Sequence, residues 1–312
     1  MTSNQFDMNS LKLILLFCFF FHVTVQAQVD TRNWCQGHMH GDEKGNNEFI
    51  HRCMKDESIV AEANSGDVKK IPLRIGIIQT GQEKELVIKE IELHRAVTGL
   101  NKAFHDTHFV FYIDRVDIIE SPLKLEDLQG ERYGVYNDFS DKHDVKDMIS
   151  IYVFDHGKEF CKVNGNSISC GRTGGFSYIL SERTSNVVMS RFDITDVKVL
   201  AHELGHFWGL YHTFEEAQFG KDNFDPNRCT EVGDRICDTP PDPGTIYEIY
   251  VNYSNCELYN LTNDDGIAYK PMIENYMSYY KPCYLKEFSF TPQQLEIMMI
   301  AATQPIRGKY VR

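Results

Sequence analysis

Three histidines and one glutamate lie close together in this sequence, in the order H-E-x-x-H-x-x-G-x-x-H. His202 and His206 are one helical turn apart, so both imidazoles leave the same face of a helix. Gly209 accepts the left-handed backbone conformation that ends a helix, and the reversal brings His212 back toward the other two rings. Three imidazole ligands suit zinc and leave a fourth position for water. Glu203 lies off the ligand axis, where it can act as general base toward that water, so the spacing predicts a catalytic zinc site.

The helix that must carry the first two histidines has its own signals in the sequence. Thr195 is expected as the N-cap residue, and Asp196 suits the positive end of the helix. Four apolar residues recur at helical spacing on the side away from the histidines: Val197, Leu200, Leu204 and Trp208. One face of this helix is therefore expected to pack and the other to bind metal.

The histidine motif resembles that of the metzincin metallopeptidases, whose second mark is a methionine-containing turn beneath the zinc. Residues 275–280 read N-Y-M-S-Y-Y and resemble this turn. Three further stretches narrow the resemblance to the pappalysin and cytophagalysin family: H-T-F at 212–214, G-D-R-I-C-D-T-P at 233–240 and F-T-P-Q-Q at 290–294. The resemblance covers about residues 67 to 300.

The resemblance implies an α+β fold of the metzincin type. A twisted mixed β-sheet, a backing helix and the active-site helix would lie above the cleft, and an irregular, disulfide-bonded C-terminal subdomain would carry the methionine turn. Met277 would form a hydrophobic base under the histidines rather than bind metal. Tyr279 matches a position where metzincins often place a tyrosine near the zinc, and its phenol could donate a hydrogen bond to the oxyanion of the tetrahedral intermediate. The alternative is a packed aromatic ring, the role expected of Tyr276 and Tyr280.

A second metal is implied by the resemblance at residues 233–240. Relatives hold calcium there, and the matching oxygens would be the side chain of Asp234 and backbone carbonyls around Ile236 and Thr239. Hard oxygen ligands on a loop suit Ca²⁺. Loop aspartates also serve as turn formers and caps, so a purely structural role stays open.

The first 27 residues predict a signal peptide. A short polar start with Lys12 precedes an apolar run at 13–21, and V-Q-A at 25–27 gives the small-residue pattern of a cleavage site. The apolar run is too short to span a bilayer comfortably, so cleavage after Ala27 and secretion are expected, without stable membrane insertion. The formal net charge of −13 argues against nucleic acid and anionic membranes as partners.

The rest of the chain is expected to hold one large domain. Residues 28–66 are polar and would be an N-terminal extension or a pro-segment. Residues 67–312 would form the catalytic domain, with an upper subdomain at about 67–209 and a lower subdomain at about 210–312.

The upper subdomain is expected to alternate strands and helices. Strand-like runs occupy residues 71–78, 109–113, 149–154 and 186–190, and a helical pattern occupies 85–105. A glycine-led run at 171–180 suits an exposed edge strand. By resemblance this strand would line the cleft and bind an extended peptide by strand addition, while an ordinary hairpin edge is the alternative.

Eight cysteines remain after the expected leader, and an even set in an exported chain indicates disulfides. Short separation along the sequence favours the disulfide pairs Cys161–Cys170 and Cys35–Cys53. The last four would staple the segment between the third histidine and the methionine turn: Cys229, Cys237, Cys256 and Cys283. Some relatives use a pro-segment cysteine to occupy the open position on zinc, so Cys35 or Cys53 could instead block the site before activation.

Together these features predict a secreted zinc endopeptidase that hydrolyses peptide bonds in peptide or protein substrates. Zinc on the three histidines would polarise the scissile carbonyl and activate water, while Glu203 takes its proton and delivers it to the leaving amine. The alternative is a secreted zinc-containing module that binds peptides without cutting them. Loss of Glu203 would have indicated such a module, and Glu203 is present.

Overall fold

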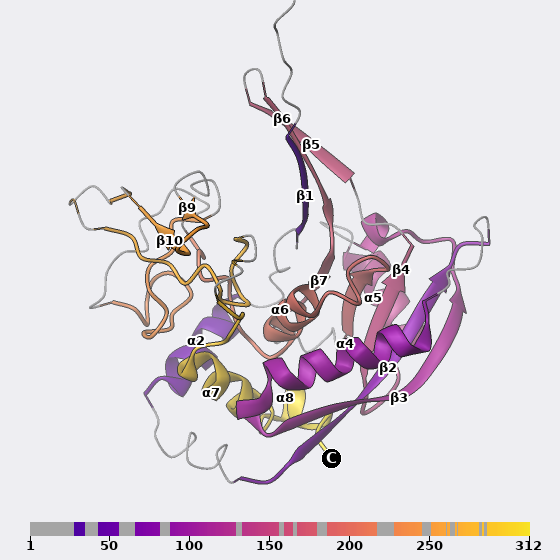
Figure 1. Cartoon of the computed structure of the whole chain (residues 1–312). Coiled ribbons are helices and arrows are strands. Elements are labelled where there is room, and N and C mark those ends of the chain that lie inside the picture. The colour runs from indigo at the N-terminus through magenta and orange to yellow at the C-terminus, as the bar shows by residue number, and fades with distance from the viewer. Residues whose placement is uncertain are drawn as a thin grey trace, which may run out of the picture. The chain divides into compact units, whose positions relative to one another are not determined.

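A computed structural model describes most of the chain (Figure 1). The described residues are 28–34, 43–55, 66–81, 88–128, 133–155, 159–164, 167–179, 186–216, 228–244, 251–259, 261–262, 266, 268–280, 283 and 286–312. The expected signal peptide and Cys35 lie outside these ranges. The chain divides into two compact units: Met1–Arg32 with Glu159–Gly171, and Asn33–Lys158 with Arg172–Arg312.

The larger unit is built on a five-stranded sheet with the order β3-β2-β4-β8-β7. Its strands are β2 (Lys69–Gln79), β3 (Phe109–Glu120), β4 (Ile149–Phe154), β7 (Gly175–Ser177) and β8 (Asn186–Ser190). The first four in the sheet order run parallel, and β7 pairs antiparallel with β8 at the edge. The four predicted strands are thus confirmed. Of the predicted exposed edge strand at 171–180, only Gly175–Ser177 forms the edge of this sheet, and its residues are buried rather than exposed, while residues up to Thr173 belong to a strand of another sheet.

Alternate residues of the central strands face two different hydrophobic cores. On β4, Ile151 and Val153 belong to the larger core, whereas Tyr152 and Phe154 belong to the smaller one. Because successive side chains of a strand point to opposite faces, this division means that both faces of the sheet are covered. Burial on both faces explains why these strands appear in the sequence as nearly continuous apolar runs.

Helices cover the two faces. On the face of the larger core, α4 (Glu90–Ala103) lies along the sheet and packs against α6 (Val197–Phe207), as Figure 1 shows. On the other face, α5 (Tyr133–His143) contributes two aromatic rings to the smaller core, which also contains Leu125 and Leu128 of the 3-10 turn Leu125–Leu128. A second 3-10 turn, His105–Thr107, follows α4 and contacts α7 (Pro292–Ala301). The expected backing helix and active-site helix are therefore α4 and α6, and the predicted α+β class with a twisted mixed sheet is confirmed.

Four helices have no counterpart among the elements expected from the sequence: α2 (Glu43–Cys53), α5, α7 (Pro292–Ala301) and α8 (Pro305–Gly308). The first lies in the polar stretch without clear periodicity, yet its Phe49, Ile50 and Cys53 join the larger core. It packs against α7, and Arg52 donates from Nη2 to Oε1 of Gln304 at 3.2 Å. Part of the expected extension therefore belongs to the same core as the sheet.

The predicted pair Cys35–Cys53 is wrong, because Cys53 is a buried free thiol. Burial among apolar residues of the core raises the pKa of this thiol to about 12. A buried thiol of raised pKa is poorly nucleophilic, and proximity along the sequence could not reveal that burial. Cys161 and Cys170, the other predicted pair, have side chains outside the described part of the structure.

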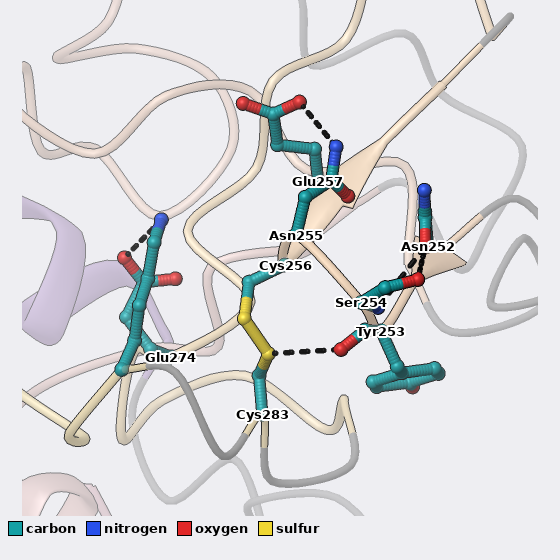
Figure 2. The surroundings of a disulfide bond; sticks show 9 residues. Asn252, Tyr253, Ser254, Asn255, Cys256, Glu257, Glu274 and Cys283 are labelled. Carbon is teal, nitrogen blue, oxygen red and sulfur yellow. Dashed lines mark hydrogen bonds and ion pairs between the residues drawn. A yellow bond between two sulfur atoms is a disulfide. The ribbon is translucent and has the colours of Figure 1, made fainter.

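Between His212 and the start of α7, the described part of the chain is mostly irregular, as predicted. The short strands β9 (Val251–Asn252) and β10 (Glu257–Leu258) pair antiparallel. Two disulfides connect this region, Cys229–Cys237 and Cys256–Cys283, so the predicted staple by the last four cysteines is confirmed. Figure 2 shows the second disulfide beside Tyr253, whose carbonyl oxygen lies 3.7 Å from Sγ of Cys283.

The smaller unit contains most of a separate three-stranded sheet with the order β1-β6-β5. Its strands are β1 (Gln28–Trp34), β5 (Glu159–Asn164) and β6 (Ser167–Thr173). Within the described residues of both units, no helix has the length and apolar character needed to cross a bilayer.

Candidate metal centre

The helix α6 presents the first two histidines, and its start differs by one residue from the prediction. Asp196, not Thr195, is the N-cap, and its carboxylate accepts a hydrogen bond from the backbone N–H of Lys198 at 2.9 Å. Both residue types are good caps, so local sequence does not choose between them. The helix ends at Phe207, and Gly209 follows with a φ of 104°, a left-handed value that suits glycine.

The predicted division of α6 into a packing face and a metal-binding face is only partly right. Leu200, Leu204 and Trp208 are buried as expected, but Val197 is half-buried. Every residue from 199 to 207 is buried, including both histidines. The metal-binding side of the helix is therefore covered by other segments rather than open to solvent.

The three histidines converge on one point. Nε2 of His206 lies 3.1 Å from Nε2 of His202 and 3.1 Å from Nε2 of His212. Two nitrogens bound tetrahedrally to zinc at about 2.0–2.1 Å are about 3.3 Å apart, so the spacing fits that ion. Among the described residues, this trio is the group of histidine, cysteine or carboxylate side chains close enough to share a metal, and Glu203 is not part of it.

The other ring nitrogens fix the tautomers of His202 and His206. Nδ1 of His202 lies 2.7 Å from the carbonyl oxygen of Tyr276, and Nδ1 of His206 lies 2.7 Å from that of Leu210. Because a carbonyl only accepts, each Nδ1 must donate, which leaves each Nε2 with a free lone pair. Burial, reinforced by the neighbouring His212, holds the pKa of His202 well below its usual range, so its imidazole is in the neutral form that binds metal.

The methionine turn packs directly beneath α6. Met277 is fully buried, and its backbone carbonyl accepts a hydrogen bond from the N–H of Thr213 at 3.2 Å. The turn is held from behind by Asn275, whose Oδ1 accepts from the N–H of Met277 at 2.8 Å. The side-chain amide of Asn275 in turn donates to Oε1 of Gln294 at 2.8 Å. These bonds connect the turn to Thr213, which follows the third histidine, and to Gln294 of α7.

Tyr279 lies beside the histidine rings. Its ring centroid is 4.8 Å from that of His212 and 5.5 Å from that of His202, and the side chain is only half-buried. By contrast, Tyr276 and Tyr280 are buried, and the hydroxyl of Tyr280 donates to Oδ1 of Asp242 at 2.9 Å. The structure thus separates the one tyrosine placed near the histidines from two that pack elsewhere.

Glu203 belongs to α6 and is fully buried where this helix packs against the edge strand β7. A Cβ atom added to Gly175 of that strand would lie 3.2 Å from Cγ of Glu203 and 2.7 Å from the carbonyl oxygen of Val188. Glycine at this position therefore lets the strand pass close to the glutamate. The strand edge and the histidine motif, predicted separately, meet at this point.

The loop proposed for calcium folds around Asp234. Oδ1 of this buried carboxylate accepts from the N–H of Ile236 at 3.1 Å and from Oγ1 of Thr239 at 2.9 Å. Oδ2 is buried and has no hydrogen-bond partner within the described part of the chain. Burial raises the pKa of Asp234 well above its usual range. A cavity of about 170 Å³ lies against this loop, with Thr213 and Asp238 also in its wall.

One known family matches the segment that carries these features. Residues 179–302 match the peptidase family whose description is pregnancy-associated plasma protein-A. That range includes the three histidines, Glu203, the loop around Asp234 and the methionine turn. This segment is similar to the pappalysin family of metallopeptidases.

Two curated relatives are both named extracellular metalloproteases. An extracellular metalloprotease of Arthroderma gypseum is 25% identical over 203 residues, which is 65% of this chain and 50% of that protein. An extracellular metalloprotease of Colletotrichum graminicola is 34% identical over 98 residues, 31% of this chain and 27% of that protein. The chain thus spans half or less of the length of the curated relatives that it matches.

Solved structures show more distant likeness. Mirolysin in complex with compound 9 matches 77% of this chain and 96% of its own, at 16% identity and a TM-score of 0.48. Metalloproteinase-II from Bacteroides fragilis matches 49% of this chain and 51% of its own, at 14% identity and a TM-score of 0.28.

Two buried acidic residues near the histidines were not among the residues expected from the sequence. Glu215 is buried, and its Oε2 lies 3.7 Å from Nδ1 of His212. Asp242 is also buried and accepts from Oγ1 of Thr213 at 2.7 Å as well as from Tyr280. The position of Glu215 three residues after the third histidine was the only local signal, because Asp242 reaches the site through a long, irregular segment.

Proposed function

We propose that this chain is a secreted zinc endopeptidase that hydrolyses peptide bonds in peptides or proteins. The observation that carries the proposal is the convergence of three Nε2 atoms at 3.1 Å spacing, beside a buried glutamate that is not one of the ligands. In His202 and His206, a backbone carbonyl at Nδ1 fixes the tautomer that leaves Nε2 able to bind a metal. Such a set suits a catalytic zinc with three protein ligands.

His202, His206 and His212 would hold the ion, which supplies Lewis acidity toward the scissile carbonyl and toward water. Glu203 takes the proton of the attacking water and passes it to the leaving amine. Its burial beside β7 keeps the carboxylate close to a substrate that lies along this strand. Tyr279, at the edge of the His212 ring, donates a hydrogen bond to the oxyanion that forms at the former carbonyl.

The substrate class follows from the sheet edge. β7 is the last strand of the five-stranded sheet, so one side of its backbone is not used by β8. An extended peptide can add to such an edge through main-chain hydrogen bonds. Because Gly175 brings this edge next to Glu203, a peptide bound there would present its backbone to the catalytic groups. Recognition through main-chain hydrogen bonds suits an endopeptidase, because these bonds do not depend on the side chains of the substrate.

The same proposal includes calcium at the loop of Asp234. Its buried Oδ2 needs a partner, because an isolated buried carboxylate is costly. Backbone carbonyls of Ile236 and Thr239 are the oxygens we assign beside it, as Ca²⁺ binds carboxylates and carbonyls on loops. The ion would stabilise the lower subdomain rather than take part in hydrolysis. We also propose that residues 67–312 form the catalytic domain, with α2 packed into its core, and that residues 1–27 direct secretion.

The test compares wild type with Glu203→Ala on a denatured protein substrate and measures bound zinc by mass spectrometry. Loss of a general base lowers rates about 10²–10⁴-fold, while zinc should remain bound, because Glu203 is not a ligand. Glu287→Ala, which changes an exposed partner of Lys102, serves as the control and should cleave as wild type does. Equal cleavage by Glu203→Ala and wild type would refute the role. Wild type that binds zinc and peptide without cutting would show the non-catalytic module instead.

A further inference from the structure

The three histidines differ in the group that faces their second ring nitrogen. Backbone carbonyls of Tyr276 and Leu210 hold Nδ1 of the first two. Nδ1 of His212 instead faces the carboxylate of Glu215. We propose that Glu215 is a positioning residue that orients the third ligand and strengthens its hold on the metal. This inference deepens the proposed function and rests on it.

A tight turn brings the carboxylate to the ring. The N–H of Glu215 donates to the carbonyl oxygen of His212 at 3.0 Å, so the two residues bracket a single turn. Oε2 then lies 3.7 Å from Nδ1, and the two side chains are 6% and 0% exposed. At this separation and burial, solvent screens their attraction little.

Two aromatic rings restrict the plane of the His212 imidazole. The Phe214 ring stacks on His212 with a centroid distance of 4.7 Å and an interplanar angle of 9°. Tyr279 meets the ring edge-on at 4.8 Å and 68°. Stacking and edge contacts fix the plane of an imidazole, but they are weakly sensitive to which nitrogen points where. A carboxylate opposite Nδ1 distinguishes the two ring nitrogens, because it favours the tautomer with hydrogen on Nδ1.

The carboxylate also contributes charge. Three neutral imidazoles leave a divalent ion uncompensated in a buried site, and charge in such a place is costly. Glu203 and Glu215 are both buried within this site, and hydrolysis uses only Glu203. Glu215 can therefore stabilise the positive charge that His212 shares with a bound cation. Partners of this kind behind a metal ligand change affinity by about 10–100-fold when they are removed.

The experiment measures zinc affinity directly, by competition with a chromophoric chelator, on the full secreted chain. Glu215→Gln keeps the shape of the side chain and removes its charge, so we expect zinc binding about 10–100-fold weaker than in wild type. Glu215→Asp keeps the charge but places it farther from the ring, so its zinc affinity should lie between those of wild type and Glu215→Gln. Glu287→Gln makes the same chemical change on the surface and should bind zinc as wild type does.

Two further measurements separate positioning from general stability. The thermal midpoint of the metal-free protein should not fall in Glu215→Gln, because the change removes a buried charge rather than a core contact. In cleavage assays, the zinc concentration for half-maximal activity should rise, while kcat at saturating zinc stays near that of wild type. If Glu215→Gln does not fold, the intermediate affinity expected of Glu215→Asp decides the question.

Two outcomes overturn the inference. One is wild-type zinc affinity in both Glu215 variants, and the other is an affinity loss matched by an equal loss of metal-free stability. Failure of the proposed function gives a different result, in which wild type binds zinc but cleaves nothing. The comparison of zinc affinities among the variants still tests Glu215 in that case.

Discussion

Met277 fills the space that the missing side chain of Gly205 leaves on α6. A Cβ atom at Gly205 would lie 2.5 Å from Sδ of Met277, closer than real Cβ contacts allow. Met277 is fully buried, so it has little room to withdraw. Gly205→Ala should therefore force the turn away from the histidines and cost about 1–3 kcal/mol of stability, as overpacking does. Thermal or denaturant unfolding measures this loss.

Gly134→Ala is a matched control for that prediction. This glycine lies in α5, and a Cβ atom there would meet nothing within 4 Å. Alanine in a helix is favoured over glycine by roughly 0.5–1 kcal/mol, so the control should be neutral or stabilising. If Gly205→Ala were as stable as Gly134→Ala, the close packing of turn and helix would not hold.

The helix α6 could be predicted because its sequence signals are local. The spacing of His202 and His206 follows from the helical period, and Gly209 marks the end of the helix by its backbone freedom. The strands could be predicted for the same reason, since runs such as β4 are apolar along their whole length. The position of the N-cap was missed by one residue because Thr195 and Asp196 are both good caps.

What could not be predicted depends on contacts between distant parts of the chain. The polar stretch that contains α2 becomes part of the core only because the helix packs against α7, far along the sequence. Nδ2 of Asn46 donates to the carbonyl oxygen of Gly209 at 3.4 Å across a separation of 163 residues. The free state of Cys53 has the same origin, because an even number of cysteines does not reveal which thiol is enclosed by the core.

Arg307 should be required for the stability of the end of α6. Its guanidinium is fully buried, lies 4.0 Å from the centre of the Phe207 ring and donates from Nε to the carbonyl oxygen of Phe207 at 2.7 Å. Nη2 also donates to the carbonyl oxygen of Tyr178 at 3.4 Å. Lysine offers one point charge instead of a planar fork. Arg307→Lys should thus leave a buried carbonyl unsatisfied and cost about 1–3 kcal/mol, measured by denaturant unfolding.

An exposed cation provides the comparison for Arg307. Arg312 lies on the surface, where Nη1 donates to the hydroxyl of Tyr112 at 3.1 Å. Arg312→Lys should change stability by less than about 0.5 kcal/mol, as surface substitutions usually do. Equal stability of both variants would mean that the buried fork is not needed.

Asp234 should make the stabilising effect of calcium depend on pH. Burial raises the pKa of this carboxyl in the folded protein, so the folded state keeps the proton to higher pH than the unfolded chain. The metal-free protein therefore loses stability as pH rises from the unfolded pKa of about 4 through the raised value. Ca²⁺ binds the ionised form, so it should raise the thermal midpoint near neutral pH and have little effect in acid.

The calcium prediction has two comparisons. Asp234→Asn removes the titrating group, so its thermal midpoint should respond to neither calcium nor this pH change. Magnesium at the same concentration should stabilise wild type less, because it demands a smaller, more rigid oxygen shell. A calcium effect in Asp234→Asn equal to that in wild type would place the ion elsewhere.

Ile50 tests whether the N-terminal stretch can be a removable pro-segment. The side chain is fully buried in the larger core, where α2 packs against α7. Ile50→Ala should cost about 2–5 kcal/mol, because it removes buried methyl groups and leaves a cavity. Glu48→Ala, on the exposed side of the same helix, should change stability little. A proteolytic activation that removed α2 would lose the same contacts, so cleavage is expected before Glu43. If Ile50→Ala were as stable as Glu48→Ala, α2 could be released without harm to the catalytic core.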